Sequence, residues 1–121
     1  MPTMKRLAAS GVVALAAAGT SVIAASPAHA DYNRCPYGTV CLFTETWGNG
    51  TMWRVPHCGD NALPASVSMA VKSARTYGNS ISFYYKDSAG SLWNTGAVNT
   101  WTSTNLGSES ANKFNLVTVW C

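Results

Sequence analysis

The chain carries little charge, and the charge it has excludes several kinds of partner. Only 11% of its 121 residues are charged, with eight Lys or Arg against five Asp or Glu. Two of the basic residues, Lys5 and Arg6, lie at the very start, so residues 31–121 carry six basic and five acidic side chains, a net charge of +1. No basic cluster is available to follow a phosphate backbone, and we therefore expect no nucleic-acid binding.

Histidine is also scarce, which limits both catalysis and metal binding. After residue 30 only His57 remains, next to Cys58. A nucleophile–base pair needs a histidine with an orienting partner, and a Cys-x5-Cys spacing is not that of a zinc site. The acids that a glycosidase would need lie in or near turn signals, where solvated side chains are expected: Glu45, Asp60, Asp87 and Glu109. We therefore expect no enzyme, no catalytic residues, no metal and no cofactor.

Only one long apolar run is present, and it lies at the N-terminus. Lys5 and Arg6 precede an Ala-rich stretch over residues 7–25, Pro27 follows, and small residues stand at Ala28 and Ala30. This pattern is typical of a secretory signal peptide, so we expect residues 1–30 to be removed by cleavage after Ala30. Residues 31–121 would then form one secreted, extracellular domain that leaves the membrane, because no second apolar run of spanning length follows.

All four cysteines lie in this second part, at Cys35, Cys41, Cys58 and Cys121. An even number of cysteines in an exported chain favours two disulfides, although three pairings are possible. We favour a Cys35–Cys41 bond that clips the turn at residues 36–38 and a Cys58–Cys121 bond that ties the C-terminus to the middle of the chain. In the chain-entropy description these contribute about 2 and about 4 kcal/mol respectively.

Residues 31–121 lack any sustained helical period. Short runs of β-branched and aromatic residues recur at 39–43, 52–55, 80–85 and 116–120, separated by Gly- and Asn-rich turns. This spacing predicts an all-β sandwich or barrel, with aromatics such as Phe43, Phe83, Tyr85 and Trp120 in the core or paired across strands. The ambiguous stretch is 65–75, which we expect to be mostly loop leading into a strand at about Val71.

A weak internal repeat divides the domain into two parts. Residues 50–53 (Gly-Thr-Met-Trp) resemble residues 90–93 (Gly-Ser-Leu-Trp), and the strand-like runs before them are similarly offset. Two copies of such a unit predict two four-stranded Greek keys that face each other across one core. Gly50 and Gly90 would take positive φ where each hairpin turns, a conformation that costs other residues more.

Residues 35–43 (Cys-Pro-Tyr-Gly-Thr-Val-Cys-Leu-Phe) resemble the opening of peptidase inhibitor family I36, small secreted actinobacterial proteins that include a Streptomyces metalloproteinase inhibitor. The spacing from Phe43 to Gly50 to Trp53 is similar to the folded hairpin of βγ-crystallins, and residues 71–75 to the Ser-containing strand that closes their first Greek key. The resemblance implies a βγ-crystallin-like Greek-key sandwich of two duplicated, disulfide-stabilised halves. It also implies inhibition of a secreted protease, in particular a thermolysin-like metalloprotease.

The sequence departs from the calcium-binding members of that fold. The stretches that would hold calcium are residues 68–73, which contain no carboxylate, and residues 108–113, which contain only Glu109. A hard cation such as Ca²⁺ needs several oxygen ligands, carboxylates foremost. We therefore expect no bound calcium.

Two loops, 47–51 and 77–81, are the predicted contacts with a protease, and Ile81 is the apolar residue expected to suit a thermolysin-like pocket. Tryptophans beside Asn- and Gly-rich turns leave a second possibility, a polysaccharide-binding surface, and a killer-toxin-like antimicrobial protein is a third. The alternative for these tryptophans is a purely structural role, in which each one covers one end of the sandwich: Trp47, Trp93 and Trp101. We expect a monomer. The predicted partner-binding residues are Trp47, Asn49, Thr51, Asn79, Ile81 and Trp101.

Overall fold

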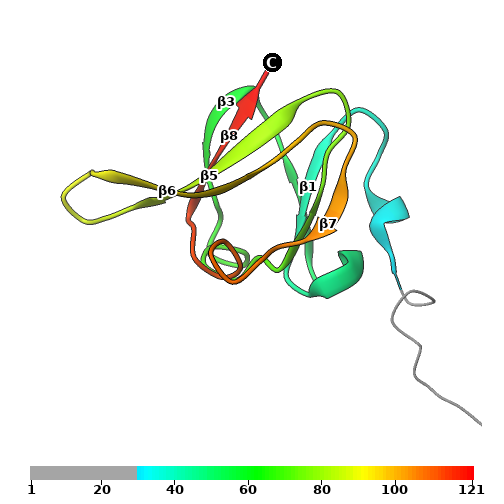
Figure 1. Ribbon diagram of the computed structural model, residues 1–121, viewed down its shortest axis with the longest axis horizontal. Coiled ribbons are helices and arrows are strands. Elements are labelled where there is room, and N and C mark those ends of the chain that lie inside the picture. Colours follow the sequence, from blue (N-terminus) through cyan, green and yellow to red (C-terminus); the bar gives the residue numbers. More distant parts are fainter. Residues whose placement is uncertain (1–29) are drawn as a thin grey trace, which may run out of the picture.

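The computed structural model describes residues 30–121, so the predicted signal peptide lies outside the described residues except for Ala30. Within this part of the chain, eight strands form two four-stranded antiparallel sheets (Figure 1). Two short 3-10 helices, η2 (Tyr32–Arg34) and η3 (Thr46–Gly48), complete the regular structure. No helix in residues 30–121 has both the length and the apolar character needed to cross a bilayer.

The two sheets have the same internal arrangement, and each half of the chain contributes to both. The first sheet has the order β2 (Met52–Val55), β1 (Val40–Phe43), β4 (Ser73–Arg75) and β7 (Ser103–Asn105). The second has the order β6 (Leu92–Val98), β5 (Ser80–Lys86), β8 (Leu116–Trp120) and β3 (Gly59–Ala62).

This order confirms the predicted duplication and adds a feature that the sequence did not indicate. Strands β1 to β4 form one Greek key and β5 to β8 the other, but the third strand of each key, β3 or β7, pairs within the opposite sheet. The two halves therefore exchange strands, and neither sheet is complete without the other half.

The core lies between the sheets and consists of inward-facing aliphatic and aromatic side chains. Phe83 on β5 stacks on Phe114, with ring centroids 4.1 Å apart and planes 14° from parallel. Both rings are fully buried, as are Leu42 on β1 and Val117 on β8. Burial of each such side chain stabilises the fold by about 1.5–3 kcal/mol.

The N-terminal segment covers the outer face of the first sheet. Strand β1 is buried on both faces, because Cys41 and Phe43 point away from the main core into a second cluster with Cys35 and Tyr77. Tyr32 packs edge-on against Phe43, with ring centroids 5.7 Å apart. Burial raises the pKa of the Tyr32 hydroxyl, and this hydroxyl donates to the Asn105 side-chain oxygen at 3.2 Å.

The predicted strands agree with the structure in the main, with three differences. Strand β4 begins at Ser73, slightly later than the predicted start at about Val71. Tyr85 lies opposite Trp93 across two strands, as predicted, but both it and Trp120 are exposed and lie outside the core. Residues 93–96, which were expected to be a turn because of their Asn and Gly, lie within strand β6, and a register shift between Phe83 and Tyr84 accommodates the irregularity.

The disulfides are the two favoured by the sequence, Cys35–Cys41 and Cys58–Cys121, with Cα atoms 5.9 and 5.8 Å apart. Both lie at one end of the sandwich, where Val40 pairs with Val55 and Ser80 with Trp120. We call this the disulfide end, and it comprises residues 35–39, 56–58, 76–79, 99–102 and Cys121. The opposite end carries the turns of the hairpins β1–β2 and β5–β6, and we call it the hairpin end.

Candidate functional site

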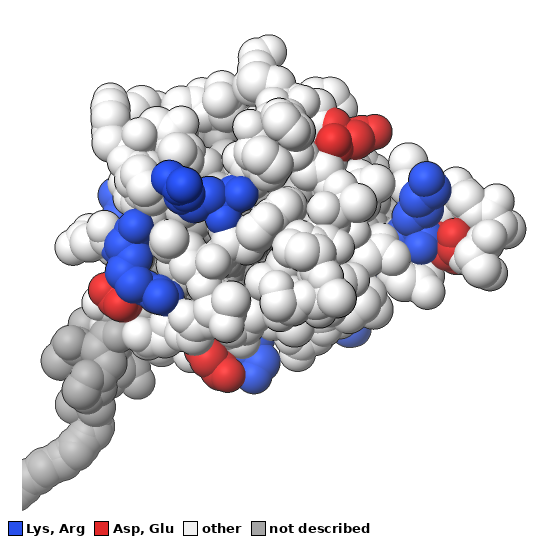
Figure 2. Space-filling view, turned by 180° about the vertical axis from the view of Figure 1, so that it is seen from behind, with Lys and Arg blue, Asp and Glu red and all other residues white. Residues whose placement is uncertain are grey.

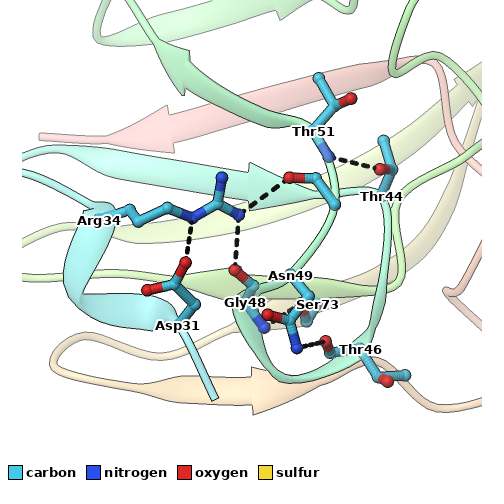
Figure 3. A network of polar contacts seen from close by, with 9 residues as sticks. Asp31, Arg34, Thr44, Thr46, Gly48, Asn49, Thr51 and Ser73 are labelled. Atoms are coloured by element: carbon cyan, nitrogen blue, oxygen red, sulfur yellow. Dashed lines mark hydrogen bonds and ion pairs between the residues drawn. The ribbon is translucent and has the colours of Figure 1, made fainter. Parts of the chain in front are cut away.

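The first predicted contact loop, residues 47–51, folds back onto the body of the protein (Figure 3). The Ser73 hydroxyl on β4 is the centre of this arrangement, because it donates to the Glu45 carbonyl (2.6 Å) and accepts the Gly48 N–H (3.0 Å). Gly50 has φ +77°, and a Cβ there would lie 2.5 Å from the Thr44 hydroxyl. The loop thus has one closely fitted conformation against the sheet.

Arg34 and the loop's own polar groups complete this folded structure. The guanidinium donates to the Gly48 carbonyl (2.7 Å) and the Gly50 carbonyl (2.9 Å), while Asp31 pairs with its Nε at 2.9 Å (Figure 3). The Asn49 amide donates to the Thr46 carbonyl at 3.2 Å. The polar groups of this loop are therefore largely engaged within the protein, and the loop does not project.

In the equivalent hairpin of the second half, β5–β6, the outer part instead projects beyond the rest of the second sheet (Figure 1, the yellow arm). Strand pairing continues out to Lys86 opposite Leu92, well beyond the last residues that reach the core. At the base of the arm, the Ser110 hydroxyl donates to the Thr95 carbonyl at 2.5 Å. The arm is therefore a two-stranded projection on a rigid base.

Asp87 organises the tip of this arm. One carboxylate oxygen accepts the N–H groups of Ala89 and Ser91, both at 2.9 Å, and the other accepts the Trp93 indole N–H at 3.1 Å. The indole bond, with the backbone bonds beside it, holds the pKa of the Asp87 carboxyl below its ordinary value. Gly90, at φ +88°, supplies the left-handed residue that closes this short turn.

Apolar side chains on the arm are directed into solvent. Leu92 is 51% exposed and Trp93 61% exposed, and Tyr85 lies directly across from Trp93. Exposed apolar groups gathered on a convex, ordered projection are typical of a surface that enters a partner's cleft.

A second exposed aromatic group lies at the disulfide end. The rings of Tyr37 and Trp101 have centroids 6.1 Å apart, and both contact Tyr77, at 5.1 and 5.9 Å. Tyr37 is 78% exposed and Trp101 64% exposed, whereas Tyr77 is buried beneath them.

A small pocket of about 180 Å³ opens at the same end, lined in part by Thr39, His57, Asn79 and the Cys58–Cys121 disulfide. No Asp or Glu side chain lines it, so no acidic side chain in the pocket orients His57 as a general base. Two acids of the sandwich are engaged elsewhere: Glu45 approaches Lys72 at 3.5 Å and Asp60 accepts the Thr118 hydroxyl at 2.6 Å.

Within residues 30–121, no three His, Cys, Asp or Glu side chains gather as metal ligands. Charged side chains are scattered over the face drawn in Figure 2, without an extended cluster of acidic residues. The described part of the chain thus offers aromatic and neutral polar groups as its main chemistry.

The prediction for Ile81 is wrong. Its side chain is fully buried on β5 and belongs to the main core, because residues 81 and 83 point inward on that strand. It therefore lies out of reach of a protease pocket. The 77–81 loop does not present the apolar side chain that was expected to contact the enzyme.

The remaining predicted residues do not form one surface. Trp47 lies at the hairpin end, where its backbone N–H donates to the side chain of Asn105, the last residue of β7. Trp101 instead precedes Ser103, the first residue of that strand. Thr51 is exposed in the same loop as Trp47, and Asn79 lies at the disulfide end.

Sequence reasoning missed Tyr37 and Leu92. The available signals were an aromatic residue between the two cysteines of a short disulfide loop and an apolar residue directly after a turn.

Solved structures with this arrangement are βγ-crystallin domains. A double-mutant clostrillin in complex with nickel is 17% identical, with a TM-score of 0.53 over 69% of this chain and 98% of that one. A βγ-crystallin domain from Clostridium beijerinckii is 17% identical, with a TM-score of 0.52 over 68% of this chain and 97% of that one. A structure described under the evolution of the eye-lens βγ-crystallin domain fold is 22% identical, with a TM-score of 0.51 over 68% and 84%.

This chain has the βγ-crystallin fold. At such identities the likeness concerns the fold alone, and the fold hosts several unrelated functions. No protein-family model matches the sequence, and no curated protein matches it significantly. The resemblance of residues 35–43 to family I36 therefore remains a resemblance, and function has to be argued from the surfaces described above.

Proposed function

We propose that this protein is a secreted inhibitor of an extracellular, thermolysin-like metalloprotease and that the β5–β6 arm is the segment that enters the enzyme's cleft. One observation carries the proposal: the second hairpin projects with Leu92 and Trp93 exposed, whereas the equivalent first hairpin is folded down. Active sites of proteases are concave, so a convex apolar arm has the complementary shape.

The order of the arm supports this role. The bonds from the Asp87 carboxylate to Ala89, Ser91 and Trp93 hold the tip in one conformation before any partner arrives. A segment that is already ordered loses less conformational entropy on binding, which favours tight association. Leu92 thus takes the role that the sequence assigned to Ile81, as an apolar side chain offered to the enzyme's pocket.

Three further observations agree with the proposal. The resemblance of residues 35–43 to family I36 implies inhibition, and two disulfides suit a protein that works outside the cell. In addition, no Asp or Glu side chain lines the pocket beside His57, which favours a binding protein over an enzyme.

The test is a titration of the oxidised protein against thermolysin, with subtilisin in parallel. We expect inhibition of thermolysin in the sub-micromolar range, weakened about tenfold or more by Leu92→Ser and by Trp93→Ala, because truncation of a central apolar contact has effects of this size. Trp120→Ala is the matched control, since Trp120 is a similarly exposed tryptophan on the outer face of β8. Absence of inhibition by the parent protein, or equal weakening by the control, contradicts the proposal.

A further inference from the structure

The disulfide end carries an aromatic surface that the proposed inhibition does not use. We call it the aromatic shelf and define it as Tyr37, Tyr77 and Trp101. The two outer rings, Tyr37 and Trp101, lie 6.1 Å apart and 37° from parallel, and both are mostly exposed. Tyr77 supports them from below in edge-on contact with each.

Each ring of the shelf is held by the fold. Tyr37 belongs to the short loop that the Cys35–Cys41 disulfide closes, and the Tyr77 hydroxyl donates to the Cys35 carbonyl at 3.1 Å. The Trp101 N–H donates to the Tyr77 carbonyl at 2.7 Å. The rings are therefore positioned without a ligand, and binding would involve little loss of side-chain freedom.

The backbone of Trp101 points to a role for its side chain beyond the turn itself. Its φ is +54°, in the left-handed region, where a bulky residue is unusual and carries strain. Glycine or asparagine would fill this turn position at lower cost. The indole also remains 64% exposed, so core burial does not account for it either.

The surroundings of the shelf are polar but mostly uncharged. Trp101 lies in the turn Asn99-Thr100-Trp101-Thr102, and the adjoining loop contributes Asn79. The cation that contacts the shelf, Arg75, is occupied, since its guanidinium lies 4.8 Å from the Tyr77 ring centroid and donates to Asn33 at 3.3 Å. In Figure 2 the same end, at the top of the view, shows few charged side chains.

This chemistry selects one kind of ligand. A cationic ligand needs carboxylates, and an anionic one needs a basic cluster, neither of which surrounds the shelf. A protein partner generally buries about 800 Å² on each side, far more than three rings offer. A sugar ring fits, because its C–H groups lie against aromatic faces while its hydroxyls bond to amides and hydroxyls such as those of Asn79 and Thr102.

We infer that the aromatic shelf binds an uncharged polysaccharide, a β-linked chain of glucose or N-acetylglucosamine units. The spacing of the Tyr37 and Trp101 rings is close to the length of one such unit, so neighbouring sugars contact the two rings in turn. The shelf lies at the opposite end from the β5–β6 arm, and this inference does not depend on inhibition of a protease.

The experiment measures binding of the oxidised protein to insoluble chitin and cellulose by depletion, and to chitohexaose and cellohexaose by calorimetry. We expect the parent to bind at least one of the two polysaccharides and its matching oligosaccharide. Trp101→Ala and Tyr37→Ala each weaken this binding about tenfold or more, and Trp101→Phe retains part of it. Trp120→Ala, which removes a 54% exposed indole on the outer face of β8 that bonds to Ser82 and is not one of the shelf rings, leaves binding unchanged.

Near-ultraviolet circular dichroism and the urea midpoint of each variant establish that it is folded. Tyr37→Ala serves as the second variant if Trp101→Ala fails to fold, because Tyr37 is 78% exposed and lies outside the strained turn. Failure of the parent to bind either polysaccharide overturns the inference. Equal weakening by Trp120→Ala and by the shelf variants also overturns it, because binding would then not reside at the shelf.

Discussion

The two hairpins β1–β2 and β5–β6 occupy equivalent places in the two Greek keys and yet differ in shape. The first ends early, with Phe43 opposite Met52, and its loop folds down onto Ser73. The second keeps its strand pairing out to Lys86 and Leu92 and projects from the body (Figure 1). Equivalent topology therefore leaves open whether a hairpin serves the fold or reaches a partner.

The difference follows from local chemistry at each turn. The first loop uses left-handed residues at Trp47, Gly48 and Gly50, and its carbonyls meet two donors, the Ser73 hydroxyl and the Arg34 guanidinium. The second turn satisfies its N–H groups from its own Asp87 and needs no donor from the body. A turn that is self-sufficient in hydrogen bonds is able to stand away from the protein.

The largest expected effect is on the free energy of unfolding, and it differs between alanine variants of the two turn glycines. Gly50→Ala should destabilise the protein by about 3 kcal/mol, because the new Cβ is strained at positive φ and would lie 2.5 Å from Thr44 and 3.0 Å from the Glu45 nitrogen. Gly90→Ala has the same φ problem but nothing within 4 Å, so about 1–2 kcal/mol is expected. Urea unfolding measures both, and equal losses would contradict the distinction between the hairpins.

A smaller effect is expected from the hydroxyl that holds the folded loop. Ser73→Ala should cost about 2 kcal/mol, because it removes both bonds and leaves the buried Gly48 N–H without its acceptor. Ser110→Ala, the corresponding test at the base of the arm, removes one bond to Thr95 and should cost about 1 kcal/mol. If thermal or urea unfolding ranked these two in the reverse order, the first hairpin would not be the one that depends on the body.

The smallest effect concerns the tip of the arm and pH. The pKa of Asp87 is lower in the folded tip than in an unfolded chain, so its bonds to the tip are fully present above the ordinary carboxyl pKa of about 3.9 and are lost as the pH falls through the lowered value. The Trp93 indole N–H resonance, followed by NMR from about pH 6 to about pH 2, should shift with a midpoint below 3.9.

Asp87→Asn is the control for this titration, because an amide does not ionise in this range and the indole resonance should then stay constant. A midpoint above the ordinary value, or the same shift in the variant, would mean that the Asp87 carboxylate does not order the tip.

Much of the fold was predictable because short-range chemistry encodes it. Alternating β-branched and aromatic runs marked β1, β2, β5 and β8, and the even cysteine count with its spacing indicated the two disulfides. Gly50 and Gly90 do take positive φ, as turn chemistry requires. These features depend on neighbours within a few residues or on covalent pairing.

The candidate sites were less predictable, and Ile81 and Trp93 show why. Both precede or follow Asn- and Gly-rich segments, so the sequence places both near turns. Ile81 lies one residue inside β5 and is fully buried, whereas Trp93 is exposed opposite Tyr85, one residue beyond the last β5 residue that pairs with β8. Whether a strand residue is buried depends on what packs over it, and that partner is distant in the sequence.

The sequence by itself determined an all-β, duplicated domain with two disulfides, because periodicity, turn residues and cysteine pairing are local or covalent properties. Only the tertiary structure decided that β3 and β7 exchange between the sheets, that one hairpin folds onto Ser73 while its equivalent projects, and that Tyr37 joins Trp101 in an exposed shelf. Those outcomes depend on packing between segments far apart in the chain. Strand exchange sets which segments meet, and solvent reaches only the side chains that no segment covers.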